Sequence, residues 1–170
     1  MTYTSPEPIK PTHDVETFDC GNPTLNDWLK KRSVESETSG ASRTYVVCYE
    51  NKVVGYYCLA SGSVIRASAP GRIKRNMPDP IPVMVLGRLA IDINHQGKGI
   101  GKGLVKDAVL RTLQASEIAG IRAILVHALD EEAKKFYVEQ CGFTVSPVHL
   151  LTLMVLLADV KKSLSQTNGE

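Results

Sequence analysis

The stretch that most constrains the fold runs from residue 83 to residue 111, VMVLGRLAIDINHQGKGIGKGLVKDAVLR. Residues 83–91 are mostly apolar and predict a buried β-strand. The stretch ends with apolar residues spaced as on one face of an amphipathic helix: Leu104, Val105, Ala108, Val109 and Leu113. Between them, glycine stands at every second position from 97 to 103. A strand, a glycine-rich turn and a helix together direct free backbone N–H groups at one anion. The stretch therefore predicts a cradle for a phosphate or pyrophosphate.

The residues around these glycines limit which known phosphate-binding motif the stretch can be. Lys98 and Lys102 stand four residues apart. If the helix has begun there, both lie on one face of its first turn, where an anion would offset their conflict with the helix dipole. A P-loop needs Ser or Thr where Gly103 stands, and the dinucleotide pattern G-x-G-x-x-G fails in both registers. The pattern that residues 96–101 do show is Q-x-x-G-x-G. The alternative is a flexible surface turn, which the flanking strand and helix disfavour.

Composition sets broader limits. A chain of 170 residues is long enough for one domain, and 20 basic against 18 acidic residues give a net charge of +2, too small by itself to indicate nucleic-acid binding. No apolar run has the length of a membrane span and no signal peptide is evident, so we expect a cytoplasmic protein with no membrane partner. The cysteines are widely spaced, which indicates buried thiols and no metal site: Cys20, Cys48, Cys58 and Cys141.

The rest of the chain predicts alternating strands and helices. We expect an extended head over residues 1–12, a helix over 24–36 with Asn22 or Thr24 as its cap, a polar loop over 33–42, and a hairpin of strands 44–49 and 53–60. Residues 62–82 show no periodic pattern. A strand over 121–128 should lie parallel to the strand over 83–91. Asp130 and Gly142 should cap a helix over 131–140, followed by strands over 143–145 and 152–157 and a flexible tail over 161–170.

A second motif is AKKFYVEQCGF, residues 133–143. With Q-x-x-G-x-G, it resembles the GNAT superfamily of N-acetyltransferases. The resemblance implies one α/β domain over residues 1–170 with the GNAT fold, a central twisted mixed sheet flanked by helices, and acetyl-CoA as cosubstrate. It implies that Tyr137 is the general acid for the departing thiolate, since a phenol with a pKa of about 10 is protonated at neutral pH. It also implies these cosubstrate contacts: Leu89, Ala90, Ile91, Gln96, Gly97, Lys98, Gly99, Ile100, Gly101, Lys102 and Phe136.

The same resemblance implies direct attack of a neutral amine on the acetyl carbonyl. A backbone N–H from a bulged strand at residues 89–91 would stabilise the oxyanion, and the strand would splay near residues 90–92 to admit the pantetheine arm. His95 and His127 are candidate general bases, although a lone histidine is more often structural. Cys141 as an acetyl carrier is disfavoured, because a helix C-terminus raises a thiol pKa.

Four further blocks extend the resemblance: FDCGNPTLNDWL from residue 18, GRLAID from 87, VHA from 126 and FTVSP from 143. They resemble GNAT toxins of bacterial toxin–antitoxin pairs of the TacT/AtaT type. Such toxins acetylate the α-amino group on aminoacyl-tRNA and block translation. The resemblance implies a ribbon-helix-helix antitoxin, a homodimer, and operator DNA bound only through the antitoxin complex. It makes four basic residues candidate tRNA contacts: Arg72, Lys74, Arg75 and Arg88.

Other functions stay open. The basic segment over residues 66–76 has an ordinary alternative as a solvated loop. The chain could instead acetylate a small amine or a protein N-terminus, which would not need that basic segment. A third possibility is a non-catalytic coenzyme A-binding module, which substitution of Tyr137 would distinguish from an enzyme.

Overall fold

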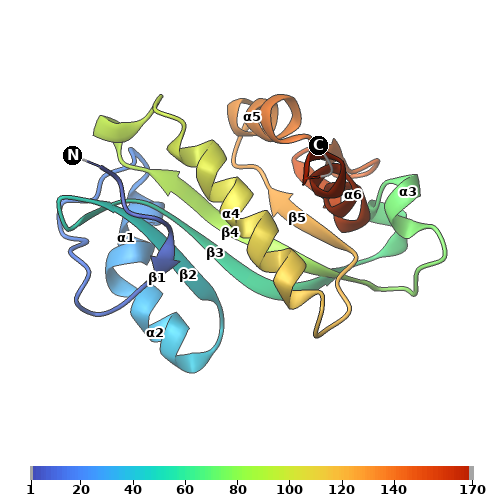
Figure 1. The fold of residues 1–170 in the computed structure, drawn as a ribbon, viewed down its shortest axis with the longest axis horizontal. Coiled ribbons are helices and arrows are strands. Elements are labelled where there is room, and N and C mark those ends of the chain that lie inside the picture. Colours follow the sequence, from blue (N-terminus) through green and yellow to red (C-terminus); the bar gives the residue numbers. More distant parts are fainter. Residues whose placement is uncertain (1, 169–170) are drawn as a thin grey trace. The chain divides into compact units, whose positions relative to one another are not determined.

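The computed structural model describes residues 2–168 (Figure 1). These residues form two compact units. Unit 1 comprises the described residues up to Ala60 together with Gly87–Ala108, and unit 2 comprises Ser61–Leu86 together with the described residues from Val109 on. The strands are hydrogen-bonded in the order β1-β2-β3-β4-β5-β7-β6, a seven-stranded mixed sheet. β3 (Lys52–Val64) and β4 (Ile81–Ile91) contribute residues to both units. The predicted α/β fold with a mixed sheet is confirmed.

Unit 1 contains β1 (Glu7–Pro8), α1 (Pro23–Lys31), α2 (Ser33–Ser39) and β2 (Arg43–Tyr49), with the 3-10 turn η2 (Ile93–His95) and the start of α4 (Ile100–Ala115). β2 is antiparallel to both β1 and β3. The two residues between β2 and β3, Glu50 and Asn51, have φ of 51° and 67°. Positive φ at both positions is the geometry of a type I′ turn, which matches the twist of a hairpin. The predicted hairpin is confirmed.

The helix expected over residues 24–36 is two helices. Asn22 caps α1, since its side-chain oxygen accepts hydrogen bonds from Thr24 N at 3.0 Å and Leu25 N at 3.3 Å. The helix ends at Lys31, and α2 follows where a polar loop was expected. Ser33 Oγ donates to Leu29 O at 2.6 Å, and Gly40 closes α2 with a φ of 80°. The loop prediction was wrong because α2 carries few apolar residues and is stabilised by bonds of this kind.

The core of unit 1 lies between α1 and the strands. α1 buries Leu25 and Leu29 against Val46 of β2 and Tyr56 of β3. Tyr56 is fully buried, and its hydroxyl donates to Leu25 O at 2.8 Å. This bond satisfies the phenol's one polar group, so the ring fills the core without the cost of an unpaired hydroxyl.

Unit 2 contains the end of β3, the 3-10 turn η1 (Arg66–Ser68), α3 (Gly71–Lys74), the start of β4 and the end of α4. β5 (Ala123–His127), α5 (Glu131–Cys141), β6 (Thr144–Val145), β7 (Thr152–Leu156) and α6 (Leu157–Asn168) follow. β4 and β5 are parallel, with Val83 opposite Ala123 and Leu86 opposite Val126. β7 is antiparallel to β5 and to β6. The predicted parallel crossover is confirmed.

The caps of α5 are also as predicted, but the chain end is not. Asp130 Oδ1 accepts from Ala133 N at 2.8 Å, and Gly142 has a φ of 76°. A flexible tail was expected over residues 161–170, yet α6 continues to Asn168, and only residues 169–170 of that tail lie outside the described chain. Asp159 in the first turn of α6 binds Arg72 through both carboxylate oxygens, at 2.6 and 2.8 Å. None of the described helices combines the length and the apolar character needed to cross a membrane.

Candidate active site

The end of β4 has an irregular backbone at Arg88. Its φ is 32°, which side chains other than glycine rarely adopt. Leu89, Ala90 and Ile91 follow, with Ala90 buried and the other two half-buried. These are the residues whose backbone was expected to bind the cosubstrate. The irregular backbone at Arg88 is compatible with the bulged strand expected at residues 89–91.

The turn after β4 is fixed by Asp92, which is only 7% exposed. Its carboxylate accepts from Asn94 N at 2.9 Å and from Asp19 N at 3.1 Å, while its own N–H donates to Val54 O at 2.8 Å. Gln96 Nε2 donates to Ile91 O at 3.0 Å and so closes the turn from the other side. The sequence indicated Gln96 as part of the motif but missed the capping role of Asp92.

Two glycines then prepare the start of α4. Gly97 has a φ of 76° and Gly99 of 82°, and a Cβ on either would meet no atom within 4 Å. Glycine is therefore required here by backbone conformation and not by space. α4 begins at Ile100, so Lys98 precedes the helix and only Lys102 lies in its first turn. The helix has therefore not begun at Lys98, which was the condition for the two lysines to share one face of its first turn. Both are exposed, and the first turn of α4 holds no acidic residue.

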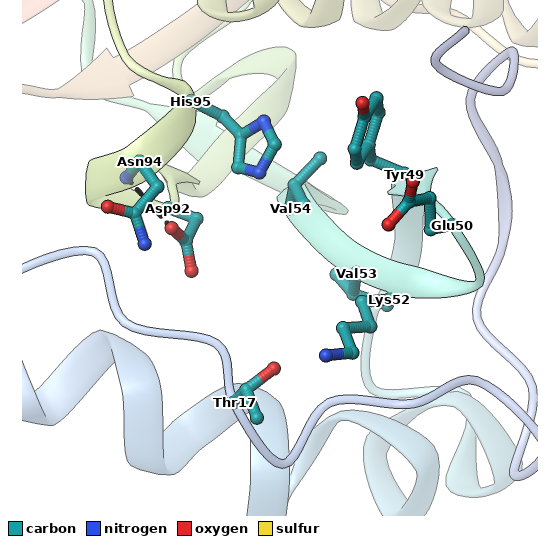
Figure 2. Close-up of a pocket in the computed structure, with 9 residues that line it drawn as sticks. All are labelled: Thr17, Tyr49, Glu50, Lys52, Val53, Val54, Asp92, Asn94 and His95. Atoms are coloured by element: carbon teal, nitrogen blue, oxygen red, sulfur yellow. Dashed lines mark hydrogen bonds between the residues drawn. The ribbon is translucent and has the colours of Figure 1, made fainter. Parts of the chain in front are cut away.

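A cavity of about 310 Å³ opens beside this turn in unit 1 (Figure 2). Its lining is mixed in charge: Thr17, Tyr49, Glu50, Lys52, Val53, Val54, Asp92, Asn94 and His95. His95, a candidate general base, lies here and its Nδ1 is 2.9 Å from the hydroxyl of Tyr3. Its ring also contacts the ring of Tyr49, with centroids 5.2 Å apart. These contacts suit a structural histidine.

Tyr137 and Phe136 lie on α5 in unit 2. Tyr137 is 5% exposed, with ring centroids 5.2 Å from Phe136 and 5.5 Å from Phe143. Burial first, and then the nearby Cys141 side chain, raise the pKa of the Tyr137 phenol well above its ordinary value. Such a group holds its proton at neutral pH and can serve as a general acid.

His127, the other candidate base, is exposed at the end of β5, and its Nδ1 lies 2.9 Å from Thr152 Oγ1. Of the candidate tRNA contacts in unit 2, Arg72 is already paired with Asp159. Lys74 is half-buried and Arg75 is exposed. Arg66, from the same basic segment, donates to the carbonyls of Lys74 and Met77. Part of the segment's charge is therefore used inside the fold.

Arg88 in unit 1 has a partner that the sequence did not indicate. Its guanidinium carbon lies 4.3 Å from the ring centroid of Trp28. The two residues are distant in the chain, and no local pattern pairs them.

One group among the described residues combines three metal-ligating side chains: Glu7, His13 and Cys48. His13 Nδ1 accepts from Lys10 N at 2.9 Å, so the ring proton is on Nε2, which donates to Glu7 at 2.7 Å. Both ring nitrogens are thus occupied by hydrogen bonds. The hydrogen bond between His13 and Glu7 joins β1 to the segment that follows it.

The fold and the motifs define an acyltransferase class, and the comparisons agree. The model of the acetyltransferase (GNAT) domain matches residues 40–145. The chain therefore belongs to the GNAT family of acetyltransferases, as its motifs predicted. A tRNA-acetylating toxin of Mycobacterium tuberculosis is 49% identical over 94% of this chain and 95% of its own length. A probable toxin TacT of Sinorhizobium fredii is 27% identical over 91% and 92%.

Solved structures of GNAT toxins are similar throughout their length. AtaT complexed with acetyl-methionyl-tRNAfMet has a TM-score of 0.88 at 30% identity, covering 96% of this chain and 99% of that one. An AtaT tyrosine-to-phenylalanine mutant bound to the C-terminus of the antitoxin AtaR and acetyl-CoA has a TM-score of 0.81 at 28% identity, covering 97% and 99%. The KacTA–DNA complex gives the same score, identity and coverage.

Proposed function

We propose that this chain is the toxin of a type II toxin–antitoxin pair, and that it transfers acetyl from acetyl-CoA to the α-amino group of an aminoacyl-tRNA. The observation that carries the proposal is the 49% identity, over nearly the whole of both chains, with a tRNA-acetylating toxin. The similarity to AtaT with an acetylated aminoacyl-tRNA supports the same substrate class. Acetylation removes the nucleophile needed for peptide-bond formation, so the charged tRNA is lost to translation.

The roles of individual residues follow the fold. The backbone after Arg88, at Leu89, Ala90 and Ile91, would supply the N–H that binds the carbonyl oxygen as negative charge develops on it. The N–H groups of residues 96–102 would bind the pyrophosphate of acetyl-CoA at the start of α4, with Lys98 and Lys102 adding positive charge. The open backbone at Gly97 and Gly99 supports this role.

Tyr137 would be the general acid. As the amine attacks and the carbon–sulfur bond breaks, the Tyr137 hydroxyl would give its proton to the departing thiolate and later recover one from the amine by way of water. Phe136 would line the pantetheine arm. The buried, protonated phenol supports this role, since an acid must hold its proton until the bond breaks.

We also propose the partners. A ribbon-helix-helix antitoxin would bind the toxin and carry it to operator DNA, in line with the AtaR and KacTA–DNA complexes of the neighbours. The chain would act as a cytoplasmic homodimer, with one acetyltransferase domain spanning residues 1–170. Arg75 and Lys74 would contribute to tRNA binding more than Arg72, which is held by Asp159.

Transfer of labelled acetyl from acetyl-CoA to a pool of charged tRNAs tests the proposal. We expect label on aminoacyl-tRNA with the wild type and a loss of about 100-fold or more with Tyr137→Phe. Tyr3→Phe, which removes a hydroxyl from the other unit, is the matched control and should keep its activity. Acetyl-CoA binding without label on any charged tRNA would refute the proposal and direct the search to small amines and protein N-termini.

A further inference from the structure

Arg88 carries an exposed positive charge that no acidic side chain in the described part of the chain neutralises. Other arginines are used inside the fold. Arg43 pairs with Glu37 and Arg72 with Asp159, while Arg122 donates to the carbonyls of Arg72 and Ile73. Arg88 instead lies on the ring of Trp28, which holds the guanidinium without cancelling its charge.

The support beneath this guanidinium is rigid. Trp28 stacks on Tyr56 with ring centroids 6.0 Å apart and planes 10° from parallel. Tyr56 is fully buried and bonded to the backbone of α1. Burial raises the pKa of the nearby Cys58 thiol to about 11, so that this thiol is neutral and leaves the charge of Arg88 intact. Three elements of unit 1 thus fix one cation.

The backbone at Arg88 is also held in place by its surroundings. Its positive φ is unfavourable for an arginine. Conformations of this kind persist only where the surroundings hold them, and they gather at functional sites. The strained residue directly precedes the strand segment that would bind the acetyl group.

Arg88 also lies on a definite face of β4 within unit 1. A Cβ atom on Gly55 would contact the side chains of Ile91, Ile100 and Leu104. Ile100 and Leu104 belong to α4, so the side chain of Ile91 faces α4. Ala90 instead packs in the core with Leu25 and Leu29 of α1. Arg88, two residues before Ala90 and stacked on Trp28 of α1, is on that second face. It therefore lies on the opposite face of the strand from the helix that would bind the acetyl-CoA pyrophosphate.

We propose that the guanidinium of Arg88, held over the ring of Trp28, binds a backbone phosphate at the aminoacylated end of the tRNA and so positions the α-amino group for attack. This inference rests on the proposed function. A guanidinium presents a planar fork that matches two phosphate oxygens, and a fork already immobilised loses little freedom on binding. Arg88 is thus a positioning residue for the acceptor substrate, and Trp28 acts through it.

The test measures steady-state acetylation of charged tRNA, acetyl-CoA affinity and thermal stability for a set of variants. Arg88→Ala should raise KM for aminoacyl-tRNA by about 10- to 100-fold and lower kcat by about threefold or more, because the α-amino group is held less well, with acetyl-CoA affinity within about threefold of wild type. Arg88→Lys keeps the charge but loses the fork, and should recover only part of the loss. Arg43→Ala, which removes an exposed arginine of the same unit that is already paired with Glu37, is the matched control and should change KM by less than about threefold.

Variants of Trp28 and the salt dependence of tRNA binding distinguish a positioned guanidinium from simple attraction between charges. Trp28→Leu should raise KM for tRNA by about 3- to 10-fold, and Trp28→Phe, which keeps an aromatic face, by less. In equilibrium binding of uncharged tRNA, Arg88→Ala should reduce the slope of log affinity against log salt by about 0.7 to 0.9, the effect of one phosphate contact. Trp28→Leu should leave that slope unchanged, because the charge is still present.

Three outcomes would overturn the inference. Unchanged KM and salt slope in Arg88→Ala, with active wild type, would refute it while the proposed function stands. A lowered melting temperature as the only effect of both Arg88 variants would assign the stack a structural role. Wild-type protein that binds acetyl-CoA but acetylates no charged tRNA would overturn both the inference and the proposed function.

Discussion

At the scale of the residue, Tyr137 shows how burial selects one chemical role for a group. In water a phenol has a pKa of about 10 and could serve as a base near that pH. The surroundings of Tyr137 in unit 2 are apolar, and burial among them raises the pKa of its phenol above that value. The hydroxyl therefore remains an acid across the pH range in which proteins are assayed.

This shift predicts the pH dependence of acetyl transfer. The α-amino group must be neutral to attack, so the rate should rise with pH and level off above about pH 8, near the pKa of such a group. Because the Tyr137 pKa is raised, the acid stays protonated and no falling limb should follow below about pH 10. Measurement of kcat/KM between pH 6 and about pH 10 checks this, with circular dichroism as the control for folding. A falling limb near pH 8 with intact protein would contradict the assigned acid.

Arg88 marks the limit of what the sequence predicts at this scale. The sequence motifs indicate Tyr137 and Gln96 as candidate site residues because each belongs to a short pattern of residues that are close together in the chain. The contact of Arg88 with Trp28 depends on the packing of α1 against β4, and Asp92 caps a turn whose partner is Asp19. Such contacts join segments distant in the sequence, so no local spacing indicates them.

At the scale of the element, local chemistry predicted most boundaries. Asn22 and Asp130 cap their helices through their side chains, and Gly142 ends α5 with a positive φ. The errors fell on α2 and α6, which are polar. Thr44 N donates to Glu37 Oε2 of α2 at 3.0 Å, and Arg72 binds Asp159 of α6. Bonds to other elements stabilise these helices, and neither propensity nor periodicity reports such bonds.

The start of α4 carries an element-scale prediction. Gly99→Ala introduces a Cβ where φ is 82°, which strains the turn without a clash and misaligns its N–H groups. Acetyl-CoA affinity, measured by calorimetry, should fall by about 10-fold or more, the effect of losing one well-placed hydrogen bond to a charged group. Gly103→Ala is the matched control, since Gly103 lies in the helix with ordinary φ and open space around its Cβ position.

Gly103→Ala should leave acetyl-CoA affinity within about twofold and stabilise the protein by up to about 1 kcal/mol, because alanine favours a helix interior. Its melting temperature should therefore rise. Equal losses of affinity in the two variants would mean that the residues of the turn and of the helix matter alike, which would contradict a cradle formed by the positive-φ glycines.

At the scale of the whole molecule, the net charge of +2 gives no general attraction for nucleic acid. Binding to tRNA must come from particular cations, and two of the exposed arginines, Arg43 and Arg72, are already paired with carboxylates. The activity should therefore depend on a few exposed basic residues and should respond to salt in proportion to them.

Arrest of translation should follow from acetyl transfer to aminoacyl-tRNA. In a cell-free translation mixture that contains no acetyl-CoA, the wild type should stop protein synthesis only when acetyl-CoA is added, because the lost α-amino nucleophile is the only damage. Tyr137→Phe should leave synthesis near the level of the untreated mixture at the same concentration, since a loss of about 100-fold or more in transfer is too slow to deplete charged tRNA. Arrest without acetyl-CoA, or an equal arrest by Tyr137→Phe, would mean that the protein blocks translation by binding alone. Fresh charged tRNA should restore synthesis once the protein is removed, because the ribosome and its factors are unaltered.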